Sequence, residues 1–316
     1  MRIRSRSAAL TALSTAAVLA LSACGESAAG AGAGGSEGGN PDTLVLAAVP
    51  SEESTSIEQQ YEHVIAAIEA ETGKEVEMQN ATDYAAVIEA QRAGQVQLAA
   101  YGPFSYTSAV DSGVGSDILG VAIEEEGAEP GYKSYGIVPE GSDITSLEDY
   151  AGKNVCFVDP TSTSGYLYPS AGLIEAGIDP EADIEATFAG GHDASALAVA
   201  DGTCDAGFAM ESMVDTTLPD SGQLAGGDLV KVWESEVIAG SPVVASDTLD
   251  EELRTQLAEL FETRINVPAL VEAGICDDEE SCVLPEESWG YAPAEDDYYD
   301  GVRSVCEVTE SESCVS

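Results

Sequence analysis

The chain has 316 residues, of which 58 are acidic and 11 are basic, so its formal net charge is −47 at neutral pH. So acidic a surface repels nucleic acid and anionic lipid, which argues against both as partners. The shortage of lysine and arginine also means that an anionic ligand would have to be held by neutral donors, such as backbone N–H, hydroxyl and imidazole groups.

Residues 1–23 have the pattern of a secretory signal peptide. Three arginines precede an apolar run that is too short to remain as a membrane-spanning helix, and small residues follow it. The segment Leu21-Ser22-Ala23-Cys24 resembles the bacterial lipobox, in which the cysteine becomes the lipidated first residue of the mature chain. We therefore expect lipidation of Cys24. The alternative is an ordinary cleaved signal beside an incidental cysteine.

Residues 24–41 are rich in Gly, Ala and Ser and are expected to form a flexible, lipidated tether. Loss of the signal peptide leaves 8 basic residues against 58 acidic ones, a net charge of −50. About 275 residues follow the tether, which suits two lobes of moderate size. Because no later apolar run could span a bilayer, we expect a protein attached to the extracytoplasmic face of the cell membrane by its lipid alone.

The first part of the body alternates strand and helix. Apolar residues recur at helical spacing in two segments, and a glycine ends each of them. This βα order predicts a parallel sheet with helices on its faces. The expected strands are Thr43–Val49, Glu75–Gln79, Gln97–Tyr101 and Asp117–Glu124, and the expected helices are Ile57–Thr72, Asp83–Ala93 and Phe104–Ser112.

A strand at Tyr132–Pro139 is expected to leave this lobe and to open a second βα series. Val243–Ser246 is expected to be the return strand, and Leu249–Glu262 reads as a long amphipathic helix. Between them, the expected strands are Asn154–Asp159, Glu185–Phe188, Asp205–Met210 and Leu229–Glu234, with helices after Ser146, after Thr163 and over His192–Asp201.

Six cysteines follow Cys24, and an even number in an exported chain favours disulfides. Cys276–Cys282 and Cys306–Cys314 are the favoured pairs, because each would close a short acidic loop. Cys156–Cys204 then remains, and both cysteines lie at expected strands. The spacings form no paired CxxC units and the chain has two histidines, so we expect no metal site and no cofactor.

The segment Asp159-Pro160-Thr161-Ser162-Thr163-Ser164-Gly165 is the most informative one in the chain. An apolar strand leads into it and an amphipathic run follows it, so its hydroxyls and free backbone N–H groups point at one place. A compact oxyanion would fit there. The alternative is a simple helix cap, which spacing alone favours.

Seven short segments, in order between about residues 43 and 270, resemble the substrate-binding subunits of bacterial phosphonate, phosphite and phosphate ABC importers. They are Val49-Pro50-Ser51-Glu52, Ala81-Thr82-Asp83-Tyr84, Tyr101-Gly102-Pro103-Phe104-Ser105-Tyr106, Ser162-Thr163-Ser164-Gly165, Gly190-Gly191-His192-Asp193-Ala194-Ser195, Cys204-Asp205-Ala206-Gly207 and Gly240-Ser241-Pro242-Val243.

This resemblance implies the type II periplasmic-binding-protein fold. Two α/β lobes, each with a mixed sheet and helices on both faces, would enclose a ligand cleft. The first lobe would comprise residues 42–134 and 245–316, and the second lobe residues 135–244. Two crossing strands, near Tyr135–Pro139 and Pro242–Ser246, would act as the hinge.

The resemblance also assigns site residues one by one. Ser162, Thr163 and Ser164 match the hydroxyl cluster that grips the oxyanion, and His192 matches a histidine in the cleft. Other ligand positions are Tyr101, Tyr84 and Glu211, although such tyrosines are more often packing residues and Glu211 is as well explained as a solvated acid. The chain crosses back to the first lobe through Ala239-Gly240-Ser241. Some relatives that bind amines carry an acidic residue there. Its absence argues against an aminoalkyl phosphonate and favours phosphite, phosphate or methylphosphonate.

The resulting expectation is a monomeric, lipid-anchored receptor that captures phosphate, phosphite or a small phosphonate and docks on an ABC permease driven by its ATPase. No catalytic residue is assigned. One alternative is a binding protein for a different small organic ligand. A less favoured alternative is a hydrolase using Ser162 or Ser164 with His192, but no nucleophile elbow accompanies them.

Overall fold

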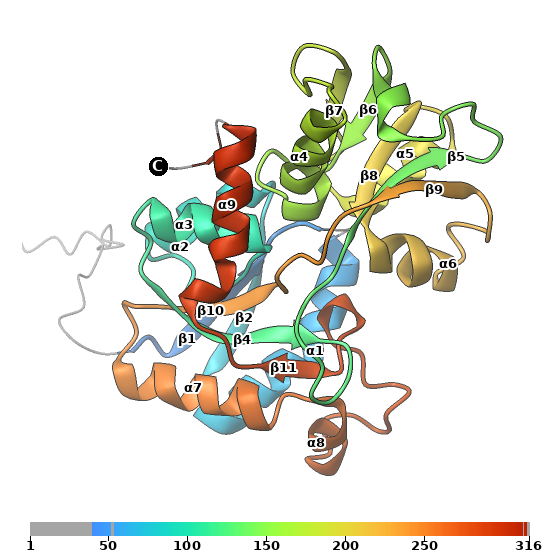
Figure 1. The fold of residues 1–316 in the computed structure, drawn as a ribbon. Coiled ribbons are helices and arrows are strands. Elements are labelled where there is room, and N and C mark those ends of the chain that lie inside the picture. Colours follow the sequence, from blue (N-terminus) through green and yellow to red (C-terminus); the bar gives the residue numbers. More distant parts are fainter. Residues whose placement is uncertain (1–39, 52–53, 312, 315–316) are drawn as a thin grey trace, which may run out of the picture. The chain divides into compact units, whose positions relative to one another are not determined.

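The computed structural model describes residues 40–51, 54–311 and 313–314 (Figure 1). The expected signal peptide, Cys24 and nearly all of the expected tether lie outside these residues. From Gly38 to Ser316 the chain forms one compact unit with two mixed sheets. Among the described helices, none combines the length and the apolar character that crossing a membrane requires.

The first sheet has six strands in the order β11-β4-β10-β3-β1-β2. β1 pairs in parallel with β2 and β3, as the βα order predicts, but β10 enters antiparallel between β3 and β4. The strands are β1 (Thr43–Ala48), β2 (Glu75–Asn80), β3 (Leu98–Ala100), β4 (Ser116–Ile123), β10 (Pro242–Ser246) and β11 (Gly290–Ala292).

Both faces of this sheet are covered by helices, because successive side chains of a strand point to opposite faces. Leu44 and Leu46 pack into one core with α1 and α7, and Ala47 packs into another with α2, α3 and α9. The helices are α1 (Ser54–Thr72), α2 (Tyr84–Arg92), α3 (Pro103–Asp111), α7 (Glu251–Thr263), α8 (Val267–Glu272) and α9 (Asp300–Thr309).

The second sheet has five strands in the order β7-β6-β8-β5-β9, with β6 parallel to its two neighbours and β5 antiparallel to both of its own. Its strands are β5 (Ser134–Pro139), β6 (Asn154–Phe157), β7 (Glu185–Phe188), β8 (Ala206–Met210) and β9 (Leu229–Glu234). The helices that accompany it are α4 (Tyr168–Glu175), α5 (His192–Ala200) and the short α6 (Leu218–Asp220).

Short helical turns fill several of the connections. A π-helical turn, η2, joins β6 to α4 and contains two of the expected site hydroxyls. The turns are η1 (Leu147–Tyr150), η2 (Thr163–Leu167), η3 (Met213–Thr217), η4 (Pro285–Glu287) and η5 (Asp296–Tyr299).

Two connections link the sheets, residues 124–133 and 235–241. They run antiparallel where Tyr132 and Ile238 exchange backbone hydrogen bonds of 3.1 and 2.8 Å. The positions expected for the hinge, Tyr135–Pro139 and Pro242–Ser246, instead lie within β5 and β10, each paired on both sides. Residues that are hydrogen-bonded to strands on both sides cannot absorb a large change of backbone angle. We therefore expect the hinge at the two connections instead.

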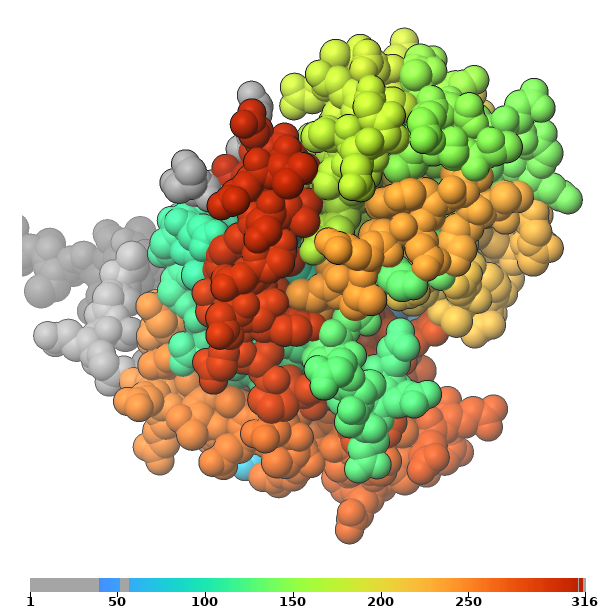
Figure 2. Space-filling view, viewed as in Figure 1, coloured from blue at the N-terminus to red at the C-terminus, as the bar shows by residue number. Residues whose placement is uncertain are grey.

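The structure contains all three expected disulfides. Cys156–Cys204 ties β6 to the segment before β8, and the other two bonds are local, Cys276–Cys282 and Cys306–Cys314. Sequence periodicity predicted no element after residue 262, where α8, β11 and α9 in fact form. Helix α9 contacts α3 beside the first sheet as well as α4 and η2 beside the second (Figure 2).

Candidate functional site

The hydroxyl segment after β6 is folded into a fixed loop. Ser162 Oγ accepts a hydrogen bond from Gly165 N (3.1 Å), and Asp159 Oδ1 accepts from Thr161 N (2.8 Å) and Thr161 Oγ1 (2.7 Å). A side chain at Gly165 would place its Cβ only 2.3 Å from Val158 Cγ2, so the loop requires glycine there. The capping interpretation of Ser162 is therefore correct, and a ligand role would be additional to it.

Ser162, Thr163 and Ser164 are buried, with 1, 2 and 1 % of their surface exposed. Thr163 Oγ1 accepts a hydrogen bond from Phe104 N (2.8 Å), at the start of α3 beside the first sheet. The Ser164 hydroxyl has no hydrogen-bond partner of ordinary geometry among the described residues. A buried hydroxyl without a partner costs about 1–3 kcal/mol, so Ser164 is a group that a ligand oxygen would satisfy.

Two tyrosines face this hydroxyl segment. The Tyr84 hydroxyl lies beside that of Ser162, and the Tyr132 hydroxyl lies beside those of Ser164 and Thr163. Burial raises the pKa of both tyrosines, so they remain neutral donors. Tyr84 was expected here, but Tyr132 was not. Its position at the start of an expected crossing strand was the available signal.

His192 begins α5. The loop before it lies against the end of the strand that leads into the hydroxyl segment, because Gly190 N donates to Val158 O (2.8 Å). The backbone N of His192 donates to Ser51 O of the first lobe (2.7 Å), and its Nδ1 accepts from Met210 N (3.0 Å). Burial lowers the pKa of His192 to about 3. The ring is therefore neutral and carries its proton on Nε2, which leaves one uncharged donor.

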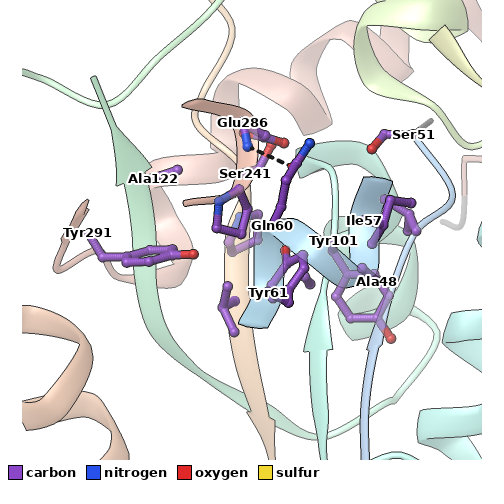
Figure 3. A pocket seen from close by; sticks show the side chains of 15 residues that line it. Ala48, Ser51, Ile57, Gln60, Tyr61, Tyr101, Ala122, Ser241, Glu286 and Tyr291 are labelled. Carbon is purple, nitrogen blue, oxygen red and sulfur yellow. Dashed lines mark hydrogen bonds between the residues drawn. The ribbon is translucent and has the colours of Figure 1, made fainter. Parts of the chain in front are cut away.

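The structure places Tyr101 differently from Tyr84. The Tyr101 hydroxyl donates to Gln91 Oε1 (2.9 Å) inside the core of the first lobe. Figure 3 shows this hydroxyl pointing away from the cavity that the Tyr101 backbone region lines. Tyr101 is thus a packing residue in this conformation, and its contact with a ligand stays a prediction.

Glu211 follows β8 and is partly buried. Its Oε1 accepts from Lys133 N (2.7 Å), and its Oε2 lies 3.4 Å from the Tyr135 hydroxyl. It also lines a small cavity together with Tyr132 and Glu286. Glu211 therefore lies close to Tyr132, which itself faces the hydroxyl segment, and it is not a fully solvated surface acid.

Two small cavities lie at this edge of the first sheet. The first is lined by the ends of β1, β3 and β10 together with Gln60, Tyr61, Glu286 and Tyr291 (Figure 3). The second is lined by Tyr132, Glu211, Glu286 and Ser288, among others. Glu286 belongs to both cavities, and sequence analysis did not indicate it. Ligands of open α/β sheets bind at the carboxyl ends of strands, which is where these cavities lie.

Most of the described basic side chains form ion pairs away from these cavities. In the part of the chain that the structure describes, Arg92, Lys133, Lys231, Arg254, Arg264 and Arg303 form ion pairs with acidic side chains. The described residues that line the two cavities include no lysine or arginine. Among the same described residues, no cluster of His, Cys, Asp and Glu could hold a metal ion. The polar groups of the candidate site are neutral donors and carboxylates.

Two lobes with mixed sheets, joined by two connections, define a periplasmic binding protein of type II. The profile of the family described as the ABC transporter, phosphonate, periplasmic substrate-binding protein matches residues 46–264. The chain is also 48 % identical over 284 residues to the "Phosphate-import protein PhnD" of Mycolicibacterium smegmatis, covering 87 % of this chain and 88 % of that protein. The chain belongs to this family of substrate-binding proteins, which are components of importers and not enzymes.

Two solved structures are similar to this one. A binding-protein component of an ABC phosphonate transporter from Pseudomonas aeruginosa has a TM-score of 0.72 at 25 % identity, covering 85 % of this chain and 86 % of that one. PhnD1 from Prochlorococcus marinus, in complex with methylphosphonate, has a TM-score of 0.74 at 18 % identity, covering 86 % and 100 %. These likenesses confirm the expected fold class. The family also implies that the protein works outside the cytoplasm.

Proposed function

We propose that this protein captures a small phosphorus oxyanion, inorganic phosphate or a close analogue such as phosphite or methylphosphonate, between its two lobes. The anion would be held by the hydroxyls of Ser162, Thr163 and Ser164, by the Nε2–H of His192 and by the Tyr84 hydroxyl. Tyr132 joins this set because it lies beside Ser164 and Thr163. Tyr101 and Glu211 would act from the edge of the site.

Binding by these groups uses uncharged dipoles in place of positive charge. Hydroxyl and N–H donors that are fixed and dry interact with an anion more strongly than the same groups do in water. A ligand with the wrong shape would leave such donors unpaired, at about 1–3 kcal/mol for each lost partner. Selectivity then follows from burial, which suits a chain in which six of the described basic side chains are used in ion pairs.

The lobes would comprise residues 42–134 with 245–316, and residues 135–244. Closure would be a hinge motion at the connections 124–133 and 235–241. Cross-lobe hydrogen bonds support a closed form, since Phe104 N reaches Thr163 Oγ1 and His192 N reaches Ser51 O. The ligand would be enclosed at the carboxyl ends of strands from both sheets.

In the cell, a lipid on Cys24 would hold the protein at the membrane, and residues 24–41 would act as a tether. The closed monomer would dock on an ABC permease whose ATPase drives import. Membership of a family of importer components supports this assembly.

The observation that carries the proposal is the buried Ser164 hydroxyl, which makes no hydrogen bond of ordinary geometry among the described residues and lies among neutral donors. The test is titration calorimetry of the compact unit from Gly38 to Ser316 with phosphate, phosphite, methylphosphonate and 2-aminoethylphosphonate. We expect one-to-one binding of at least one of them. Ser164→Ala and His192→Ala should each weaken that binding at least tenfold while the protein stays folded. Full affinity in both variants would refute the assigned site.

A further inference from the structure

The two connections between the sheets form an antiparallel ribbon that is incomplete on its first-lobe side. Tyr132 and Ile238 exchange both backbone hydrogen bonds, of 3.1 and 2.8 Å. In an antiparallel ladder a second pair of this kind follows two residues further along, and here it would join Pro130 to Gly240. Proline has no backbone N–H, so this pair cannot form both of the ladder hydrogen bonds.

Two tyrosine hydroxyls occupy the places of the ladder hydrogen bonds at this pair. Gly240 N donates to the Tyr298 hydroxyl oxygen (3.0 Å), and the Tyr298 hydroxyl donates to Pro130 O (2.6 Å). This one hydroxyl therefore bridges the two connections. The Tyr299 hydroxyl donates to Gly240 O (3.1 Å), which is the acceptor that a backbone N–H at position 130 would have used.

The same tyrosines, which end η5 and lead into α9, belong to a segment that is fixed to the first lobe. The Tyr299 ring is buried, and its centroid lies 4.7 Å from that of the Tyr106 ring of α3. The Tyr106 hydroxyl donates to Asp296 Oδ1 (2.9 Å). Arg303 forms ion pairs with Asp296 (3.0 Å) and with Asp111 of α3 (3.2 Å). The turn η5 and the start of α9 are thus tied to α3.

There is little room for movement around the bridging hydroxyl. A Cβ at position 240 would lie 2.6 Å from Val121 Cγ1 and 3.2 Å from Pro130 Cβ, so the close approach of this connection to β4 requires glycine. Burial raises the pKa of Tyr298 and of Tyr299, so both hydroxyls keep their protons and remain donors. The bridge therefore consists of closely packed, neutral groups.

These hydrogen bonds decide where the connections can bend. A bend between Pro130 and Gly240 would break bonds to both tyrosines, and a bend at the directly paired residues would break both bonds of the ladder. Glu236 and Val237 lie beyond that ladder pair, toward the second sheet, and both are exposed. A change of backbone angle costs less there, because packing constrains exposed connecting residues less.

We propose that Tyr298 and Tyr299 form a clasp that ties Pro130 and Gly240 to the first lobe and confines hinge bending to the part of the connections nearer the second sheet. This inference rests on the function proposed above, because that function requires lobe closure. The clasp limits the orientations that the ligand-free lobes adopt. Less conformational entropy is then lost on closure, so the clasp strengthens binding without touching the ligand.

The test measures the distance between the lobes of the Gly38–Ser316 unit by pulsed electron spin resonance. Spin labels are attached at Glu62→Cys on α1 and Glu175→Cys on α4, two exposed positions in different lobes. Tyr298→Phe, alone and together with Tyr299→Phe, removes hydroxyls and keeps the rings. Without ligand, both variants should broaden the distance distribution relative to wild type. The double variant should also bind phosphate at least threefold more weakly.

Tyr150→Phe is the matched control, because it removes a buried hydroxyl that also donates to a backbone carbonyl, Ile137 O (3.4 Å), but lies inside the second lobe. It should keep the wild-type distance distribution. An unchanged distribution in both clasp variants would overturn the proposal, and so would an equal broadening in Tyr150→Phe. Failure of the wild-type unit to bind any phosphorus oxyanion contradicts the proposed function instead, and the ligand-free distances distinguish the two results.

Discussion

At the scale of single residues, internal hydrogen bonds occupy one atom of each candidate side chain and so determine which atom is left to contact a ligand. The Nδ1 atom of His192 accepts from Met210 N, and Thr163 Oγ1 accepts from Phe104 N, so each side chain keeps its remaining hydrogen for another partner. Ser162 Oγ likewise accepts from Gly165 N. Internal hydrogen bonds thus orient three neutral groups as donors, which is what an oxyanion requires.

The buried, neutral His192 makes a prediction about stability and pH. Its folded pKa of about 3 lies below the ordinary 6.5, so between these values the unfolded chain binds a proton that the folded chain does not. Its contribution to stability is complete above pH 6.5 and is lost as the pH falls toward 3. Between pH 7.5 and pH 5.0, wild type should lose about 2 kcal/mol more unfolding free energy than His192→Gln.

Urea unfolding at the two pH values measures this difference, and the acidic residues common to both proteins cancel in the comparison. An equal loss of unfolding free energy in wild type and His192→Gln would show that the imidazole titrates normally in the folded protein.

At the scale of elements, backbone N–H groups at the starts of helices in one lobe donate hydrogen bonds to oxygen atoms of the other lobe. Asp159 Oδ2 lies 3.4 Å from Tyr84 N at the start of α2, and Thr163 caps α3. In the opposite direction, Ser51 O receives His192 N at the start of α5. Helix starts carry unpaired N–H groups and partial positive charge, so these contacts stabilise the lobes in contact.

The disulfides differ in the length of chain that they close, and this gives a prediction. Cys156–Cys204 spans 48 residues and Cys306–Cys314 spans 8. On the chain-entropy estimate the first contributes about 4 kcal/mol and the second about 2.5 kcal/mol. Replacing Cys156 and Cys204 together by alanine should therefore lower the unfolding free energy more than replacing Cys306 and Cys314. Chemical denaturation of both double variants measures this, and the reverse order would contradict the entropic account.

At the scale of the whole molecule, the net charge of −47 opposes the approach of any anion. In the proposed site, local dipoles would hold the ligand, but the long-range field is repulsive until salt screens it. We predict that the association rate constant for phosphate rises as NaCl increases from about 10 to 500 mM, where the Debye length falls from roughly 30 Å to a few ångströms.

Stopped-flow mixing, with the intrinsic fluorescence of the protein as the signal, provides the measurement. Dissociation should change much less, because the buried donors are little affected by bulk ions. An association rate that falls with salt would indicate a positive entry path that outweighs the net charge.

The sequence by itself determined the local features. Periodicity identified most strands and helices up to residue 262, and the spacing of cysteines gave the disulfide pairs, because these patterns depend on near neighbours or on simple pairing. The run Ser162-Thr163-Ser164 was visible for the same reason. Tyr84 and Tyr101 looked alike in sequence, since each lies near the end of a strand or the start of a helix.

Tertiary structure decided the rest. Packing turned the Tyr101 hydroxyl to Gln91 and brought Tyr84 to Ser162, 78 positions away in the sequence. It also placed Glu286, from a segment that has no periodic signal, in one cavity with Tyr132, which begins an expected strand, and it placed α9 against both lobes. Composition and spacing do not predict contacts between distant parts of the chain or a left-handed backbone at a glutamate. These features form only when the sheets and connections pack together.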